Sequence, residues 1–303
     1  MQDLSVGVLA DEHMLGGPLD ARRALFSRAR ESGVDHVFVA DHISFHTGFG
    51  MDGLIQAATA AALDPVLRVH IGVYLLALRH PVPVARQLAS LAEAAPGRIV
   101  LGVGVGGEDR HEIEICGVDP RTRGRRTDAC LTAIRGLLSG EPTSHDDAFF
   151  SFDAALIRPA PDPAIPIVVG GRSDAAIRRA GTLGDGWLGV WCSPRRFAAV
   201  LAEVAEHGKE REVTWRHGLQ VWVGLDDDRD RARERLKHRM ENMYRIPFER
   251  FEKYSPYGTP EAVAEFLAPY REVGCVDFNV MAVSESTEAS IDGIARVREQ
   301  LAG

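Results

Sequence analysis

The sequence lacks several patterns that would point to common classes of protein. Its few cysteines are scattered and form no CxxC or other metal-binding spacing: Cys116, Cys130, Cys192 and Cys275. We therefore expect free thiols in a reducing compartment. An HExxH helix motif and a GxSxG elbow are also missing, which disfavours a zinc hydrolase and an α/β-hydrolase nucleophile.

Long apolar runs are missing as well. No run approaches the ~20 residues that span a bilayer. The first residues lack the basic stretch and apolar core of a signal peptide, so we expect a soluble cytoplasmic protein with no membrane partner. The formal net charge of −8 disfavours nucleic acid as a partner. An anionic cofactor remains possible, because backbone N–H groups at helix starts bind phosphate whatever the net charge.

What is present is an alternation of short apolar runs with longer amphipathic ones. The expected strands are 4–10, 36–40, 68–76, 98–105, 165–169, 186–190, 219–225 and 275–282. The expected helices are 18–32, 51–63, 81–95, 125–138, 173–182, 194–206, 229–244, 260–273 and 287–301. Eight βα units in this length predict one α/β domain over residues 1–303, a TIM (β/α)8 barrel.

Two long interruptions separate these elements. They cover 106–123 and 139–163, with a weak hairpin pattern at 149–157. We interpret both as active-site loops on the C-terminal face of the barrel.

Polar residues and glycines follow the predicted strands at that face. Asp41 and His42 end the second strand, where His42 would donate a hydrogen bond or a proton to a bound ring; the alternative is a helix cap. Gly72 and Val73 lie within the third strand, and a glycine there indicates either a close ligand or barrel packing.

Gly102, Gly104 and Gly107 spell the GxGxxG dinucleotide pattern after the fourth strand. A dinucleotide loop must open a helix at once, but a charged stretch follows here, with the next convincing helix much later. We favour small residues that let a flat ligand lie close. The alternative, an NAD-linked dehydrogenase, predicts an open sheet.

The fifth strand ends in Gly170, Gly171, Arg172 and Ser173, just before a helix that begins near Asp174. Exposed backbone N–H groups, the helix dipole and an arginine together make a phosphate site, although Asp174 would oppose an anion. The alternative is an ordinary turn with an N-cap.

Taken together, these strand ends resemble the bacterial-luciferase-like superfamily of flavin- and deazaflavin-dependent (F420) oxidoreductases. The most specific stretches are 72–108 and 166–187, with Gly184-Asp185-Gly186-Trp187 in the second. The resemblance implies a cis peptide bond between Gly72 and Val73 that forms a bulge against the cofactor ring.

The resemblance also implies roles for single residues. Asp41 and His42 would lie beside the ring, and Gly106, Gly107 and Glu108 would line its pocket. The loop 170–173 would hold the cofactor's phosphate. His42 and Glu108 are the expected proton-handling residues.

The expected activity is hydride transfer between coenzyme F420 and a small organic substrate, because Asp41-His42 is a pairing seen in many F420-dependent members. Two alternatives remain: an FMN-dependent monooxygenase in the same pocket, and a non-catalytic flavin-binding barrel. The sugar-phosphate pocket of the F420-dependent glucose-6-phosphate dehydrogenases is not evident, and Asp128-Ala129 replaces a frequent Asp-Glu pair. We expect a homodimer. The loops 45–50, 110–122 and 142–152 would define the substrate.

Overall fold

The computed structural model describes residues 4–46, 48–107 and 109–303. Eight parallel strands close into a barrel: β1 (Ser5–Leu9), β2 (His36–Val39), β5 (Arg68–Leu75), β6 (Ile99–Gly104), β9 (Ile167–Gly170), β10 (Gly186–Val190), β11 (Gly218–Leu225) and β13 (Asp277–Val283). The ring closes where β1 pairs with β13 and β10 pairs with β11. This closed barrel confirms the predicted fold and contradicts the open sheet of the NAD-linked alternative.

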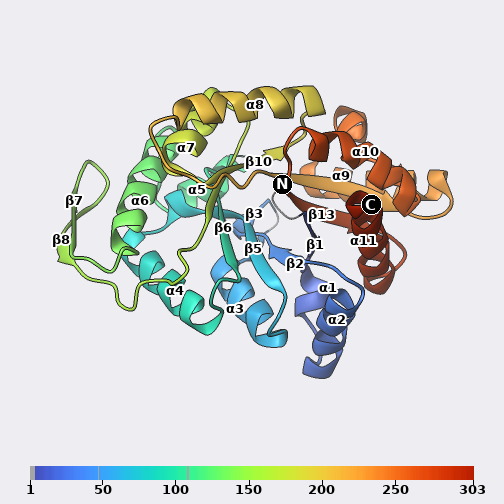
Figure 1. Cartoon of the computed structure of the whole chain (residues 1–303), viewed down its shortest axis with the longest axis horizontal. Helices are drawn as coiled ribbons and strands as arrows, with labels where there is room; N and C mark the ends of the chain where they lie inside the picture. The colour runs from blue at the N-terminus through green and yellow to red at the C-terminus, as the bar shows by residue number, and fades with distance from the viewer. Residues whose placement is uncertain (1–3, 47, 108) are drawn as a thin grey trace.

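Helices surround the barrel (Figure 1). They are α2 (Leu19–Glu31), α3 (Gly53–Leu63), α4 (Pro81–Ala94), α6 (Arg123–Leu137), α7 (Asp174–Leu183), α8 (Pro194–His207), α9 (Arg229–Tyr244), α10 (Pro260–Glu272) and α11 (Thr287–Ala302). Their ends agree with the predicted ones to within about two residues. Side-chain caps mark several starts, as Asp52 does for α3, Ser193 for α8 and Thr259 for α10.

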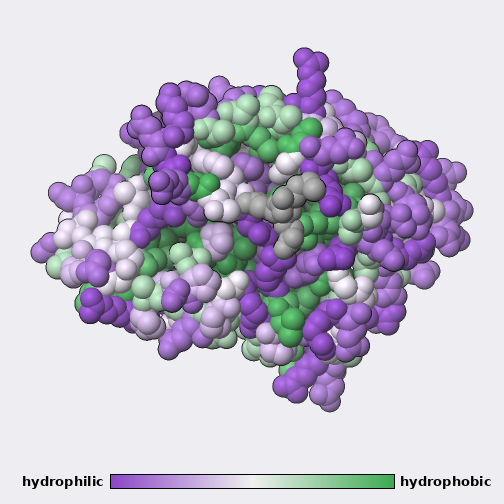
Figure 2. All heavy atoms as spheres, in the orientation of Figure 1, coloured by the Kyte–Doolittle hydropathy of each residue, from purple (hydrophilic) through white to green (hydrophobic). Residues whose placement is uncertain are grey.

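Most apolar side chains pack between the barrel and the helices in one continuous core. A second, smaller cluster lies where the ends of β11 and β13 pack against α9 and the short helix η2 (Phe248–Arg250). Figure 2 shows a largely hydrophilic outer surface, with apolar residues gathered toward the middle of the face in view. None of the helices in the described part of the chain is long and apolar enough to cross a membrane.

Short elements interrupt the βα alternation. A helical turn, α1 (Glu12–Leu15), follows β1, and an antiparallel hairpin, β3 (His42–Phe45) and β4 (Phe49–Met51), follows β2. The interruption at 106–123 contains α5 (Arg110–Ile115) and lies at the C-terminal face, as predicted. The helix after Gly107 therefore begins much sooner than the sequence suggested.

The interruption at 139–163 is not an active-site loop, which corrects the prediction. It contains the hairpin β7 (Thr143–Asp146) and β8 (Ser151–Ala155), which lies outside α6 at the edge of the molecule (Figure 1). The segment connects the end of α6 to the start of β9, and α6 has already carried the chain back toward the N-terminal ends of the strands. Phe150 reaches His80 and Arg126 on the outside of the helix ring, away from the cavity.

Candidate active site

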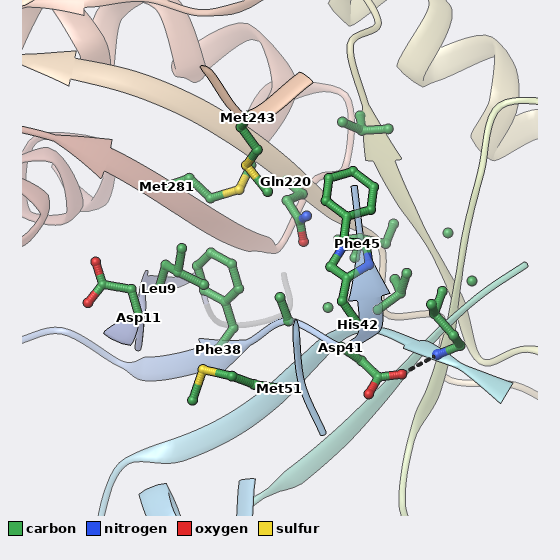
Figure 3. Close-up of a pocket in the computed structure, with 18 of the residues that line it drawn as sticks. Leu9, Asp11, Phe38, Asp41, His42, Phe45, Met51, Gln220, Met243 and Met281 are labelled. Atoms are coloured by element: carbon green, nitrogen blue, oxygen red, sulfur yellow. Dashed lines mark hydrogen bonds between the residues drawn. The ribbon is translucent and has the colours of Figure 1, made fainter. Parts of the chain in front are cut away.

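A cavity of about 270 Å³ opens at the C-terminal ends of the barrel strands. Each of the eight barrel strands contributes to its wall, through Leu9, Phe38, Gly72, Gly104, Gly170, Leu188, Gln220 and Met281. The hairpin β3–β4, α1 and α9 complete the rim, and Figure 3 shows several of these side chains converging on one space. Ligand sites in this fold lie at the same end of the barrel.

The floor of the cavity is a bulge in β5. The peptide bond between Gly72 and Val73 is cis, as predicted. The pairing of β5 with β6 shifts between Ile71 and Tyr74, so one extra residue of β5 is accommodated there. The bulge moves the backbone of β5 and the side chain of Val73 into the cavity wall.

Neighbouring glycines make room for this bulge. A Cβ on Gly104 would lie 2.3 Å from Cγ2 of Val73, and one on Gly170 would lie 3.0 Å from its Cγ1. A Cβ on Gly102 would lie 2.1 Å from the carbonyl oxygen of Ile71. Two glycines of the GxGxxG pattern thus accommodate the adjacent strand, while Gly104 also borders the cavity. The structure gives no support to a dinucleotide loop here.

His42 lines the cavity, and a carboxylate holds its ring. Its Nδ1 lies 3.1 Å and 3.3 Å from the two carboxylate oxygens of Glu112. None of the described residues forms a hydrogen bond with Nε2. A carboxylate at one ring nitrogen orients the imidazole and leaves the other nitrogen to exchange a proton with a ligand.

Glu112 is a buried residue of α5, and its own contacts keep it ionised. Oε1 accepts hydrogen bonds from the backbone N–H groups of Ile43 (2.6 Å) and Ser44 (3.1 Å). Burial acts to raise the pKa of Glu112, but these donors and His42 outweigh burial and lower the pKa below its usual value. One carboxylate therefore fixes both the His42 ring and the backbone of the hairpin that carries it.

A second contact ties α5 to the same hairpin. Asp109 caps α5 by accepting from the backbone N–H of His111. It also accepts from the backbone N–H of His46 at 2.7 Å. Hydrogen bonds thus hold the hairpin after β2 and the helix α5 after β6 together beside the cavity.

Asp41 borders the cavity but is occupied by the protein itself. The guanidinium of Arg79 donates to both of its carboxylate oxygens, at 2.6 Å and 2.8 Å. The backbone N–H groups of Gly53 and Leu75 complete its shell. The structure therefore gives Asp41 an anchoring role between β2, α3 and β5, and no free oxygen pointed at a ring.

The other predicted ring-side residues divide into two groups. Gly106 lines the cavity, whereas Gly107 is exposed and does not border it. Gly106 has φ +69°, a conformation that L side chains rarely adopt. Glu108 lies outside the residues that the structure describes, so its predicted role stays a prediction.

The residues of the predicted phosphate loop also differ in whether they line the cavity. Gly170 and Gly171 line the cavity, but Arg172 and Ser173 are exposed beside it. Ser173 caps α7 by accepting from the backbone N–H of Ala176. The guanidinium of Arg172 lies 5.5 Å above the ring of Trp191. A glycine pair, an arginine and a capped helix start thus lie together at one edge of the cavity.

Two buried polar atoms at the cavity have no protein partner among the described residues: Oε1 of Gln220 and Nε1 of Trp191. Buried polar atoms are nearly always hydrogen-bonded. A Cβ on Gly72 would lie 2.8 Å from Oε1 of Gln220, so this oxygen adjoins the bulge. Unmatched polar atoms, a bulged floor and the glycine-rich edge fit a flat, polar-edged cofactor with a phosphate.

Sequence reasoning missed Glu112, Arg79 and the apolar side of the cavity. Glu112 lies within the stretch 106–123 that we interpreted as a loop, and the only sequence signal for its helix was Asp109, a residue type that commonly caps helix starts. Arg79 comes from a turn after β5. Their partners lie about 40 to 70 residues away along the chain, a separation that no local pattern reveals.

Comparison with known proteins gives one family and two kinds of enzyme. The model of the family described as luciferase-like monooxygenase matches residues 4–274. An F420-dependent glucose-6-phosphate dehydrogenase of Beutenbergia cavernae is 35% identical over 222 residues, which cover 69% of this chain and 66% of that protein. The 4-hydroxyprotoasukamycin monooxygenase of Streptomyces nodosus subsp. asukaensis is 31% identical over 285 residues, which cover 85% of this chain and 74% of that protein.

Solved structures share the fold. An F420-dependent secondary alcohol dehydrogenase superposes with a TM-score of 0.85 at 20% identity, covering 99% of both chains. At that identity the likeness concerns the fold alone. The chain spans 60% of the length of uncharacterised mycobacterial relatives that are 34% identical to it.

Proposed function

The chain belongs to the luciferase-like monooxygenase family, and from this premise we propose that it is an F420-dependent oxidoreductase. It would transfer a hydride between the deazaflavin and a small organic substrate. The observation that carries the proposal is His42, a cavity-lining histidine that Glu112 holds at Nδ1 and that has no hydrogen bond at Nε2 from any described residue; the bulge at Gly72 lines the same cavity. The 35% identity to an F420-dependent dehydrogenase supports the same choice of cofactor.

Different residues of the chain would bind the ring and the phosphate of the cofactor. The bulge at Gly72 and Val73 would support the ring from below, and Gly106 would allow a close approach at its edge. The side-chain amide of Gln220 would meet a polar ring atom. Gly170 and Gly171, with Arg172 and the start of α7, would bind the phosphate.

Deazaflavin, when bound, supplies a carbon centre that accepts or gives a hydride and reacts poorly with oxygen. When the substrate is oxidised, Nε2 of His42 would accept the proton that the reacting group of the substrate releases as its hydride passes to the cofactor, and the carboxylate of Glu112 would stabilise the resulting imidazolium. In the reverse direction the same nitrogen would return the proton.

A second candidate is an FMN-dependent monooxygenase. It is favoured by the monooxygenase relative, which matches more of the chain than the dehydrogenase does, 85% against 69%. The same cavity residues would serve it, with oxygen as the co-substrate.

The test is a titration of the purified protein with coenzyme F420 and, separately, with FMN, followed by fluorescence. Submicromolar binding of F420 with weak binding of FMN supports the proposal. The reverse result overturns it and makes oxygen consumption the next assay. Binding of neither rejects the cofactor site itself. We also propose a homodimer, which light scattering on the eluting protein would test.

A further inference from the structure

One side of the cavity is apolar and belongs to no part of the proposed cofactor site. It comes from β1, β2, β11, β13 and α9, and consists of Leu9, Phe38, Trp222, Met243, Tyr244 and Met281. Figure 3 shows Leu9, Phe38, Met243 and Met281 extending toward the cavity from several elements, with His42 on its other side. We refer to these six residues as the apolar wall.

The apolar wall is the inner surface of the second hydrophobic cluster. Behind it pack Leu236, Met240, Phe248 and Phe251, all buried. Nε1 of Trp222 donates to the hydroxyl of Tyr244 at 3.0 Å, so the one polar atom of the indole already has a partner within the wall. The wall therefore offers a ligand mainly hydrocarbon and sulfur surface, held in place by a packed layer.

Charge around the cavity does not favour an anionic substrate. Arg239 is the only lysine or arginine among the described lining residues, and its guanidinium lies 3.5 Å from the carboxylate of Glu12. The carboxylate of Asp11, beside Glu12, accepts hydrogen bonds from backbone N–H groups at the start of α1. A phosphorylated substrate needs several cationic or N–H donors converging on it. The donors at the glycine-rich edge are assigned to the phosphate of the cofactor, and Arg239 is the only described cationic lining residue on the rest of the rim.

We infer that the substrate is an uncharged, predominantly apolar organic molecule whose hydrocarbon part packs on the apolar wall and whose reacting polar group faces Nε2 of His42. This inference rests on the proposed oxidoreductase function and names its substrate class. Methionine side chains are unbranched and adapt to irregular shapes, so Met243 and Met281 let the wall accept a range of chain lengths. Sugar phosphates, which the F420-dependent relative is named for, do not fit this surface.

The test measures binding rather than turnover. Full-length protein, with and without added F420, is titrated with 2-butanol, 2-hexanol and 2-octanol by calorimetry and by tryptophan fluorescence, since Trp222 lines the cavity. We expect Kd to tighten roughly threefold to fourfold for each added CH2 group. Octanoate is expected to bind at least about tenfold more weakly than 2-octanol because its charge would be buried against apolar surface.

Variants locate the binding surface. Met281→Gln and, independently, Met243→Gln keep the side-chain length but add a polar amide, and each should weaken 2-octanol binding about tenfold or more. Ile55→Gln, a change at an exposed apolar residue of α3 outside the cavity, should leave it unchanged. Circular dichroism melting shows that each variant is folded, and F420 affinity should stay within about twofold in all of them.

The outcomes separate the inference from the function on which it rests. A Kd that is independent of chain length, or glucose 6-phosphate binding more tightly than 2-octanol, overturns the apolar substrate site. Chain-length dependence that Met281→Gln and Met243→Gln abolish supports it, even where neither F420 nor FMN binds. In that last case the oxidoreductase proposal fails while the apolar site stands.

Discussion

The two ends of the barrel both contain histidines, but they use them in opposite ways. At the N-terminal end, His36 is enclosed by the barrel: Nδ1 contacts Oγ of Ser5 at 2.7 Å and Nε2 contacts Oδ1 of Asn279 at 2.8 Å. At the C-terminal end, His42 has one nitrogen held by Glu112 and the other facing a cavity. A histidine with both nitrogens occupied supports structure, whereas one with a free nitrogen can do chemistry.

The surroundings of the two histidines reinforce the contrast. The ring of His36 stacks on that of His70 with centroids 3.8 Å apart, and Gly7 leaves room for it. Burial lowers the pKa of His36 to about 3 and that of His70 well below its usual value, so both are neutral at physiological pH. Arg216, which pairs with Asp277, also opposes their protonation.

The cluster of His36, His70 and Asp277 at the N-terminal end of the barrel shows that proximity alone does not make a metal site. Ligand-type atoms of His36, His70 and Asp277 lie within 4.8 Å of one another. However, the two imidazole planes are nearly parallel, at 15°, so their lone pairs do not converge on one point. Both ring nitrogens of His36 and the carboxylate of Asp277 already have protein partners. The group is better explained as a packed polar layer that closes the barrel beneath the cavity.

The largest effect should come from His42. His42→Gln removes the proton-handling nitrogen, and we expect kcat to fall about 10²–10⁴-fold with little change in melting temperature. Steady-state kinetics with saturating cofactor measures it. His111→Gln changes an exposed histidine of α5, next to Glu112, that does not line the cavity, and it should retain near-normal kcat. An equal loss in both variants would show that the packing of α5 against the hairpin, rather than Nε2 of His42, sets the rate.

At the N-terminal end of the barrel we expect the opposite: a loss of stability with little loss of activity. His36→Leu removes one hydrogen-bond partner from Oγ of Ser5 and one from Oδ1 of Asn279, which should lower the unfolding free energy by about 2–4 kcal/mol. Urea denaturation measures the loss, and kcat of the folded fraction should change less than tenfold. A fall in kcat as large as that of His42→Gln would make His36 part of the catalytic machinery and end the contrast between the two ends.

Acid should destabilise the protein through its buried neutral histidines. Burial lowers the pKa of His217 to about 4, while in the unfolded chain a histidine titrates near pH 6.5. Between these values the unfolded chain binds more protons, so stability is complete above about pH 6.5 and is lost as the pH falls toward 4. Each such histidine should contribute a slope of up to about 1.4 kcal/mol per pH unit.

His217→Asn isolates one contribution. The asparagine oxygen can still accept from the backbone N–H of Trp187, as Nδ1 of His217 does, but it cannot titrate. The unfolding free energy, measured by denaturant at intervals from pH 4.5 to 7.5, should depend less steeply on pH in the variant. An unchanged slope would mean that His217 has the same pKa in the folded and the unfolded protein, and would contradict a pKa lowered by burial.

The sequence was informative where the physics is local. Short continuous apolar runs predicted all eight strands, because a parallel barrel strand is buried on both sides. Strand ends located Asp41, His42, Gly72 and Gly170 at the cavity, since the C-terminal ends of parallel strands meet at one face. The GxGxxG pattern was also correctly set aside, although two of its glycines, Gly102 and Gly104, make room for β5 rather than for a ligand alone.

The remaining features depend on long-range contacts. Asp41 was predicted beside a ring, but Arg79, 38 residues away, occupies it. The segment 139–163 was predicted to be an active-site loop, but none of its residues lines the cavity, and Phe150 packs outside the helix ring on His80 and Arg126. Loop length does not reveal such a packing. The apolar wall combines residues from β1 to β13, and its members are indistinguishable from core residues in the sequence alone.

The smallest predicted effect concerns the start of α7 at the edge of the cavity. It compares two serines that cap helix starts in the same way. Ser173 accepts from the backbone N–H of Ala176 at the start of α7, and Ser193 accepts from that of Arg196 at the start of α8. Ser173→Ala and Ser193→Ala should each cost about 1 kcal/mol of stability. Only the start of α7 lies next to cavity glycines, so only Ser173→Ala should also weaken F420 binding, by about threefold to tenfold. Calorimetry with F420 and thermal melting give the two numbers for each variant. If both caps cost the same stability and neither changes the affinity, the phosphate does not bind at Ser173, and the loop 170–173 is an ordinary turn with an N-cap.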